Sequence, residues 1–220
     1  MLNELSVSLE DMQSTITKVE LQDNELIELR QLELGYNRIT RVEGLEKNIS
    51  LQQLILTSNR IKTMENLDSL QKLEILDLSS NGISVIQGLE NLKDLREIYL
   101  SFNKIQQLSG LESNRKLEII DVNNNRLRKI DGIQNLSKLT VFWAARNQLA
   151  DTNEIQRLAD LSNLRSLQFG SNPFVRQIAF RSLLLSTLPQ ITKLDSQVFR
   201  RSRQRISDTL DDEYEWDRAS

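Results

Sequence analysis

Two aspartates, Asp77 and Asp121, occupy equivalent places in two similar short segments of the chain. A pair of carboxylates can work as general acid and general base in a hydrolysis. The chain contains no His, the commonest general base, and no Cys. This excludes Ser-His-Asp and Cys-His catalytic sets as well as a thiolate metal site. With no Gly-rich phosphate loop in the sequence either, paired carboxylates are the one catalytic arrangement left to weigh.

Both aspartates belong to a segment that recurs along the chain. Residues 73–81 (LEILDLSSN), 95–103 (LREIYLSFN) and 117–125 (LEIIDVNNN) follow one another at a constant spacing. The units begin at Leu29, Leu51, Leu73, Leu95, Leu117, Leu139 and Leu164. The first six starts are evenly spaced and the last interval is longer, so residues 151–163 contain a three-residue insertion. A fixed period of this length predicts a solenoid.

One unit predicts its own local structure. In a strand, alternate side chains point to opposite faces, so Leu76 and Leu78 should point inward and Asp77 outward. The turn that follows buries backbone groups, and an Asn side chain can both donate and accept the hydrogen bonds they need. We therefore expect a structural ladder of seven asparagines: Asn37, Asn59, Asn81, Asn103, Asn125, Asn147 and Asn172. Apolar residues three apart in the return halves predict 3₁₀ or short helical turns.

The units divide the chain into four parts. Residues 1–28 are expected to hold an N-terminal cap, either a short helix within 1–15 or a frayed terminus, and a truncated first repeat at 16–28. Residues 29–172 hold the repeats, and residues 173–199 a cap in which Ile178, Leu184, Leu185 and Leu188 should cover the last coil. Residues 200–220 form a charged tail, with a basic nucleic-acid patch as the alternative to a solvated segment.

The outward strand positions form a surface that we call the strand face, the concave side of a curved solenoid. Acidic residues recur on it, and large apolar residues occupy solvent-facing positions, which indicates a surface that binds a partner. The candidate partner-binding residues are Glu33, Ile55, Asp77, Glu97, Tyr99, Asp121, Val141, Trp143 and Gln168. An acidic column attracts a basic partner. Asp77 and Asp121 would lie two strands apart, roughly 10 Å, on an open face, so we expect no catalysis.

Composition excludes several partners. The formal net charge is −3, which argues against nucleic acid as the main partner. The sequence has no long apolar run that could span a membrane and no signal-peptide pattern at its start, so we expect no membrane contact and an intracellular protein. No metal and no cofactor is expected. The protein should be a monomer until it binds its partner.

The repeat resembles the 22-residue intracellular class of leucine-rich repeat, which residues 73–92 (LEILDLSSNGISVIQGLENL) match almost throughout. This implies an α/β fold, a right-handed leucine-rich-repeat solenoid with parallel concave strands, short 3₁₀ or helical convex segments and a C-terminal cap. Residues 29–37 (LRQLELGYN), residues 95–103 and Phe142-Trp143 are similar to the leucine-rich-repeat regulatory subunit of protein phosphatase 1. The similarity covers residues 29–199 and corresponds to the C-terminal part of that subunit, whose additional N-terminal repeats are absent here.

This second resemblance implies a function. The strand face would hold the catalytic subunit of protein phosphatase 1, in the nucleus and cytoplasm, and modulate its activity, maturation or targeting. Glu33, Asp121 and Trp143 keep the residue types of that family at contact positions. Ile55 replaces an aromatic residue, Val141 an acid and Gln168 a Tyr. The alternatives are a ciliary or dynein-associated scaffold, and a splicing component resembling the spliceosomal A-prime protein.

Overall fold

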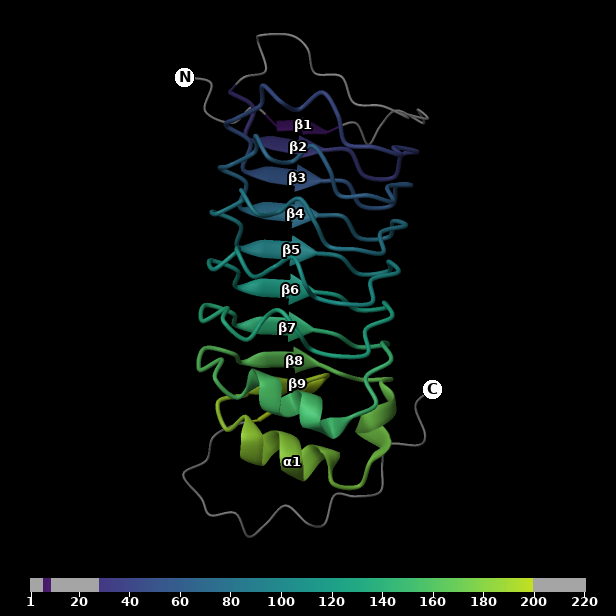
Figure 1. Ribbon diagram of the computed structural model, residues 1–220, viewed down its shortest axis with the longest axis vertical. Helices are drawn as coiled ribbons and strands as arrows, with labels where there is room; N and C mark the ends of the chain where they lie inside the picture. The colour runs from purple at the N-terminus through teal and green to yellow at the C-terminus, as the bar shows by residue number, and fades with distance from the viewer. Residues whose placement is uncertain (1–5, 9–27, 200–220) are drawn as a thin grey trace.

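The computed structural model describes residues 6–8 and 28–199, and within them the chain winds into a stack of coils (Figure 1). Each coil contributes one very short strand to a single sheet, in which the strand order follows the chain order. The strands are β1 (Ser6–Ser8), β2 (Gln31–Glu33), β3 (Gln53–Ile55), β4 (Ile75–Asp77), β5 (Glu97–Tyr99), β6 (Ile119–Asp121), β7 (Val141–Trp143), β8 (Ser166–Gln168), β9 (Lys193–Leu194) and β10 (Gln197–Val198). The expected solenoid is confirmed.

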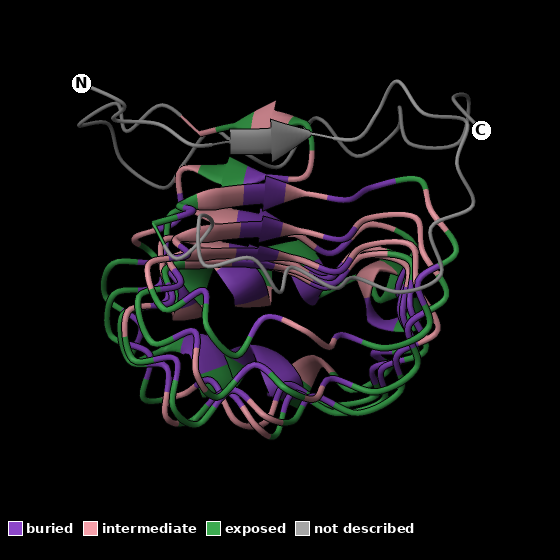
Figure 2. Cartoon of the chain, turned by 90° about the horizontal axis from the view of Figure 1, so that it is seen from above, coloured by how far each residue is buried: buried purple, intermediate pink, exposed green. Residues whose placement is uncertain are grey.

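Neighbouring strands from β1 to β9 pair in parallel, and β10 turns back to pair antiparallel with β9. Seen along the stack, the strands line one side and the return segments the other (Figure 2). The middle residue of each strand from β2 to β8 points between them, as Leu76 and Ile98 do, and is completely buried. Burial of one such side chain stabilises the fold by about 1.5–3 kcal/mol. The core is therefore one continuous apolar column.

The return segments are mostly successions of turns. In the described part of the chain, the 3₁₀ helices are η2 (Thr152–Leu158), in the unit with the insertion, and η3 (Pro173–Arg176), at the start of the C-terminal cap. Close stacking requires glycine at one return position: Gly110 has φ +104°, and a Cβ there would overlap the carbonyl oxygen of Ile86. No described helix is long and apolar enough to cross a membrane.

The N-terminal edge of the sheet differs from the sequence expectation. Ser6–Ser8 forms β1 and pairs with β2, so a helix over residues 1–15 is wrong at these positions. The number of residues that separates Ser6 from its partner Gln31 is the same as that between Val141 and its partner Ser166, in the unit with the insertion. β1 thus occupies the sheet edge beside β2, where the truncated first repeat of residues 16–28 was expected. The segment proposed as a truncated repeat lies outside the described residues, apart from Glu28.

Asparagine side chains join each coil to the one before it. The Nδ2 of Asn103 donates to the carbonyl oxygen of Leu78 in the preceding coil at 2.9 Å, and to those of Leu100 and Ser101 in its own coil at 3.1 and 3.3 Å. Its Oδ1 accepts from the backbone N–H of Ile83 at 2.9 Å. One side chain therefore satisfies backbone groups of two successive turns.

The same arrangement recurs along the stack. The backbone N–H groups that donate to the ladder in the other coils belong to Ile39, Ile61, Ile105, Leu127 and Leu149. The residue before each ladder asparagine has positive φ, which turns the chain sharply away from the strand. Examples are Tyr36 (φ 57°), Phe102 (φ 55°) and Arg146 (φ 54°). Such backbone costs free energy for residues other than glycine, and the turn hydrogen bonds hold it in place.

The C-terminal cap closes the core with aromatic rings. Phe142, Phe169, Phe174 and Phe180 form a chain of contacts with centroid separations of 6.0, 5.3 and 5.0 Å. They are positioned by β7, β8, η3 (Pro173–Arg176) and α1 (Phe180–Thr187). Asp195 directly follows β9, and its Oδ1 accepts from the backbone N–H groups of Phe169 and Gly170 at 2.8 and 2.9 Å, which ties the cap to the end of β8.

Among the four residues expected to cover the last coil, Leu184 and Leu188 are buried and Leu185 is half-buried. The expectation for Ile178 is wrong, since this side chain is 97% exposed. Ile178 precedes α1 and so lies outside the face that the helix turns toward the core. Phe180, at the start of the helix, covers the coil instead.

We predict that Asn103→Ala lowers the free energy of unfolding by about 2–4 kcal/mol, because it leaves buried backbone groups of two coils without partners. Urea unfolding followed by circular dichroism measures the change. Asn135→Ala is the matched control, since Asn135 is exposed on a return segment and should cost less than about 0.5 kcal/mol. Equal costs for the two variants would contradict a structural role of the ladder.

Candidate functional site

The sheet register brings the outward residues of successive strands into one central column. Each member is paired directly with the next, and all are partly accessible. In order, the column is Glu33, Ile55, Asp77, Tyr99, Asp121, Trp143 and Gln168. A second column, two residues earlier in each strand, contains Glu97 and Val141. The register therefore brings all nine candidate partner-binding residues onto a single surface.

An acidic group with an aromatic centre occupies the middle of the strand face. Tyr99 lies between Asp77 and Asp121 on the neighbouring strands, and its hydroxyl donates to Glu97 Oε2 at 2.7 Å. Asp77 and Asp121 each use Oδ1 to accept a backbone N–H two residues further on, at 2.8 and 2.9 Å. These short bonds fix both carboxylates against the ends of their strands, so their orientation is set before any partner arrives.

The environment of this group disfavours further negative charge. Burial raises the pKa of Asp121, the backbone hydrogen bond from Asn123 lowers it, Asp77 raises it, and a bond with Ser101 lowers it, with a net increase. Burial also raises the pKa of Tyr99 above the usual range of a phenol, and the hydrogen bond with Glu97 adds to this effect. Tyr99 therefore stays protonated and keeps donating to Glu97. A cation from a partner would relieve the repulsion between these carboxylates.

Trp143 stands beside Asp121 at the next position of the central column. Its indole Nε1–H donates to Ser166 Oγ at 3.4 Å, a long hydrogen bond that leaves the ring as a partly accessible apolar surface. Next to it, Asn123 accepts from the backbone N–H of Ala145 at 2.7 Å and donates to Gln168 Oε1 at 3.0 Å. Asn123 was not among the expected site residues. Its place in the outward column after the strand was the signal in the sequence.

The strand face has one sign of charge and no basic residue in the columns supplied by β2 to β8. The remaining outward positions hold apolar side chains, including Ile55, Ile75, Ile119 and Val141, or uncharged polar ones, including Gln31, Gln53 and Ser166. A partly accessible apolar surface among carboxylates fits a protein partner that presents both aliphatic and basic groups.

The arrangement offers little to an acid–base reaction. Asp77 and Asp121 are separated by the whole of β5, and thus by about 10 Å, with Tyr99 between them. No group of three or more acidic residues that could hold a metal ion occurs among the described residues. The face is open, so nothing would exclude water from a reacting group.

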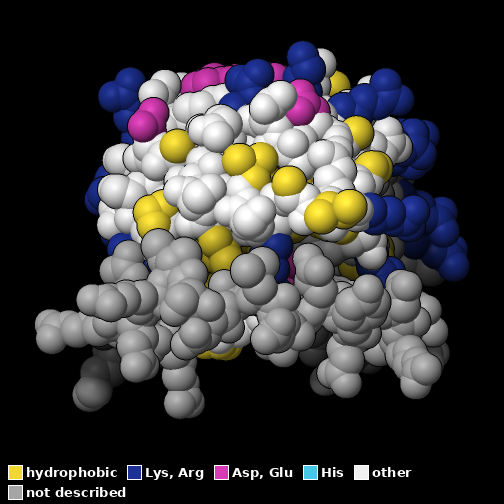
Figure 3. Space-filling view, turned by 90° about the horizontal axis from the view of Figure 1, so that it is seen from below, with side chains coloured by type: hydrophobic (Ala, Val, Ile, Leu, Met, Phe, Trp, Pro, Cys, Tyr) yellow, Lys and Arg dark blue, Asp and Glu magenta, His cyan; other side chains and the backbone are white. Residues whose placement is uncertain are grey.

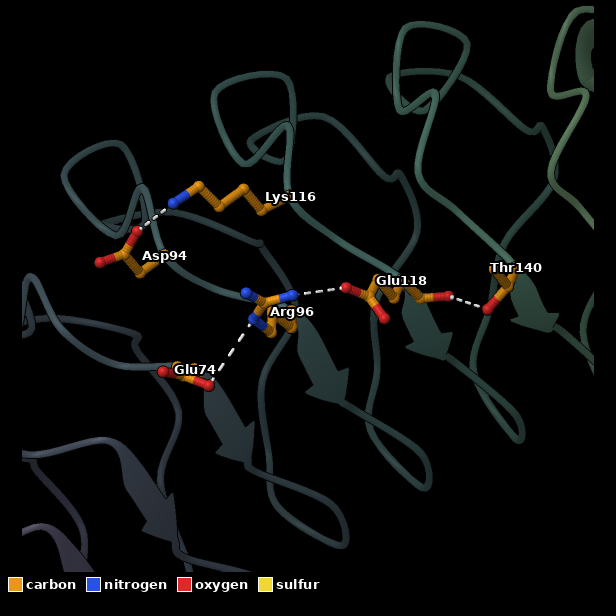
Figure 4. A network of polar contacts seen from close by, with 6 residues as sticks. All are labelled: Glu74, Asp94, Arg96, Lys116, Glu118 and Thr140. Atoms are coloured by element: carbon orange, nitrogen blue, oxygen red, sulfur yellow. Dashed lines mark hydrogen bonds and ion pairs between the residues drawn. The ribbon is translucent and has the colours of Figure 1, made fainter.

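Ion pairs at the edge of the sheet, which sequence reasoning missed, border this face (Figure 4). Arg96 reaches Glu118 on one side at 2.7 Å and Glu74 on the other at 3.6 Å, while Lys116 pairs with Asp94 at 2.5 Å. These side chains are substantially exposed, so each pair contributes at most about 1 kcal/mol. Alternating charges at equivalent positions of successive units were the signal that pointed to them.

Comparisons with known proteins identify the repeat. Residues 72–215 match the profile of the leucine-rich repeat family. No curated protein sequence matches the chain.

Solved structures give the same fold. An internalin from Listeria monocytogenes is 26% identical with a TM-score of 0.67, over 76% of this chain and 47% of its own. A leucine-rich repeat protein from Leptospira interrogans is 27% identical with a TM-score of 0.68, over 75% and 42%. Internalin C2 from Listeria monocytogenes is 27% identical with a TM-score of 0.68, over 86% and 79%. The present chain thus spans less than half of the first two proteins.

Asp121→Asn should raise the stability near neutral pH by less than about 1 kcal/mol, because it removes a partly accessible charge that folding disfavours. The folded-state pKa of Asp121 is raised, so the protonated form is favoured by folding, and stability is lost as the pH rises through that pKa. The advantage of Asp121→Asn should therefore disappear as the pH falls and the wild-type carboxyl is protonated. Urea unfolding across the acid range measures this.

Glu90→Gln is the matched control, since Glu90 is exposed on a return segment. It should show no pH-dependent gain. If Asp121→Asn lowers the stability at neutral pH, our account of the acidic group is wrong.

Proposed function

Because the chain belongs to the leucine-rich repeat family, whose fold is typically that of a non-enzymatic interaction scaffold, we propose that it is a regulatory subunit of protein phosphatase 1. In this proposal the strand face holds the catalytic subunit. The adjacency of Asp121 and Trp143 in the central column is the observation that carries it. Together they offer a fixed carboxylate next to a large accessible ring.

Several features of the strand face support a basic, partly apolar partner. Carboxylates at Glu33, Asp77, Glu97 and Asp121 provide attraction without an opposing basic residue in the strand columns. Trp and Tyr side chains frequently dominate the binding energy of protein interfaces, because they bury much area with few rotatable bonds. Glu33, Asp121 and Trp143 also keep the residue types that the phosphatase subunit family has at its contact positions.

The proposed mechanism is occupation of a phosphatase surface away from the reacting groups. Binding there changes the targeting, maturation or activity of the enzyme without any chemistry by this chain. The fixed Asp77 and Asp121 carboxylates steer a basic surface toward the face, and desolvation of Trp143 holds it. The complex would form in the nucleus and cytoplasm.

A runner-up follows from three residues that depart from the phosphatase-binding pattern. Ile55, Val141 and Gln168 replace an aromatic, an acidic and a Tyr side chain, so the strand face differs from that family in both charge and aromatic content. The same face would then serve a different basic protein, as in a ciliary or dynein-associated scaffold. Its mechanism of attraction is the same, and only the partner differs.

Trp143→Ala is expected to weaken binding of the phosphatase catalytic subunit by about 2 kcal/mol, or roughly 30-fold, because it removes the largest apolar side chain of the face. A pull-down and a titration with the purified catalytic subunit measure the effect. Circular dichroism should show an intact fold, since Trp143 points outward.

Ile178→Ala serves as the control because Ile178 is an exposed apolar residue just before α1, outside the strand face. Its affinity for the phosphatase should equal that of the wild type. If the wild type does not bind the catalytic subunit, the runner-up replaces the proposal. If it binds and Trp143→Ala binds equally well, the site is placed wrongly.

A further inference from the structure

The turns that follow the strands are rich in basic residues, and these residues do not belong to the strand face. We call this surface the basic flank and define it as residues 36–41, 58–63, 80–85, 102–107, 124–129 and 146–151. It contains nine basic residues and one acidic residue, Asp151, in a chain whose formal net charge is −3. The nine are Arg38, Arg41, Arg60, Lys62, Lys104, Arg126, Arg128, Lys129 and Arg146, and all are exposed.

The fold stacks these cations along one edge of the molecule. In Figure 3 a large group of Lys and Arg side chains lies on the right, the side toward which the strands point in Figure 1. Successive coils are about 4.8 Å apart, so Arg38 and Arg60, or Lys104 and Arg126, lie one above the other. Five of the six coils contribute cations and residues 80–85 contribute none, so the flank extends over roughly 24 Å of the stack with one gap.

Most of these cations have no ion pair among the described residues, unlike the basic residues around Arg96 on the opposite edge of the sheet. Within the described residues Arg41 is the only one of the nine with an ion pair, to Glu65 at 2.8 Å. On the opposite edge of the sheet, Arg96 lies between two glutamates and Lys116 pairs with Asp94. An uncompensated row of like charges repels itself, and an anionic partner would remove that repulsion.

Two exposed aromatic side chains belong to the same surface. Tyr36 is 78% exposed and Phe102 is 58% exposed, and the left-handed turn before each ladder asparagine directs both away from the core. They add apolar contact area among the cations. A surface with this combination fits a ligand that is anionic and also carries apolar groups.

We propose that the basic flank is a second docking surface, and that it binds an acidic polypeptide segment of a partner protein. A run of Asp and Glu residues lies along the stack, and its carboxylates pair with Arg and Lys side chains from successive coils. Tyr36 and Phe102 contact apolar residues within that run. This surface is separate from the strand face, and the proposal does not depend on the identity of the partner there.

The surroundings of the flank disfavour nucleic acid as the occupant. The strand face beside it carries Glu33, Asp77 and Asp121, and the phosphates of a wide duplex would be brought toward these carboxylates. A single strand binds by stacking successive bases on aromatic side chains. Tyr36 and Phe102 lie three coils apart, about 14 Å, which is too far for successive bases. An acidic polypeptide is narrow enough to stay away from the strand-face carboxylates, and its binding does not require bases to stack on neighbouring aromatic side chains.

Fluorescence anisotropy with the full chain tests the proposal. The probes are a labelled glutamate-rich peptide, the same peptide with glutamine in place of each glutamate, and a labelled uridine RNA of equal length. The flank variant combines Arg60→Gln, Lys62→Gln, Lys104→Gln and Arg126→Gln.

The control variant combines Lys72→Gln, Lys93→Gln, Arg115→Gln and Lys138→Gln. Its four residues are exposed on the opposite edge and have no ion pair within the described residues. Both variants lose the same charge. Circular dichroism establishes that both keep the fold.

We expect the wild type to bind the acidic peptide with an affinity that falls as the salt concentration rises, and not to bind the glutamine peptide. The flank variant should lose at least about tenfold in affinity and the control variant less than about twofold. Trp143→Ala should bind the peptide as the wild type does, which separates this surface from the strand face.

Three results would overturn the proposal. Tighter binding of RNA than of the acidic peptide would make the flank a nucleic-acid surface. An equal loss in the two variants would show that net charge alone attracts the peptide. Failure of the wild type to bind the peptide at low salt would show that the flank is a solvated edge.

Discussion

The hydrogen bonds that one asparagine makes to two successive coils are the interaction on which the rest of the structure depends. A three-residue strand is not stable on its own, and each coil contacts only its neighbours. Asn103 joins the turn after Leu100 to the carbonyl of Leu78 and to the N–H of Ile83, so it sets the distance and the register between coils. The ladder thereby turns a linear repeat into a rigid stack with an apolar column inside.

That register decides which side chains become neighbours. Residues at equivalent positions of successive coils lie about 4.8 Å apart along the stack, so any residue type that recurs at the repeat spacing becomes a continuous surface. Asp77, Tyr99 and Asp121 form an acidic group with an aromatic centre in this way. A few residues further along each unit, the left-handed turn separates the strand face from the basic flank.

The described residues consequently form three charged surfaces with different behaviour. The strand face is acidic and apolar, the basic flank is cationic and almost without ion pairs among the described residues, and the edge around Arg96 is internally paired. Charges that are paired within the chain have little left to offer a partner, whereas the other two surfaces retain their attraction. The two proposed binding surfaces are those whose charges the fold leaves uncompensated.

The sequence by itself determined the solenoid, the strand positions, the asparagine ladder and the members of the central column, because a constant repeat period and strict strand alternation are local properties. It misplaced Ile178, since the start of α1 depends on how Phe180 packs against Phe174, and it did not anticipate β1. Only the tertiary structure decided that Asn123 reaches Gln168, that burial and Asp77 together raise the pKa of Asp121, and that nine cations share one edge. These properties arise between coils, where distance in space and distance in the sequence no longer correspond.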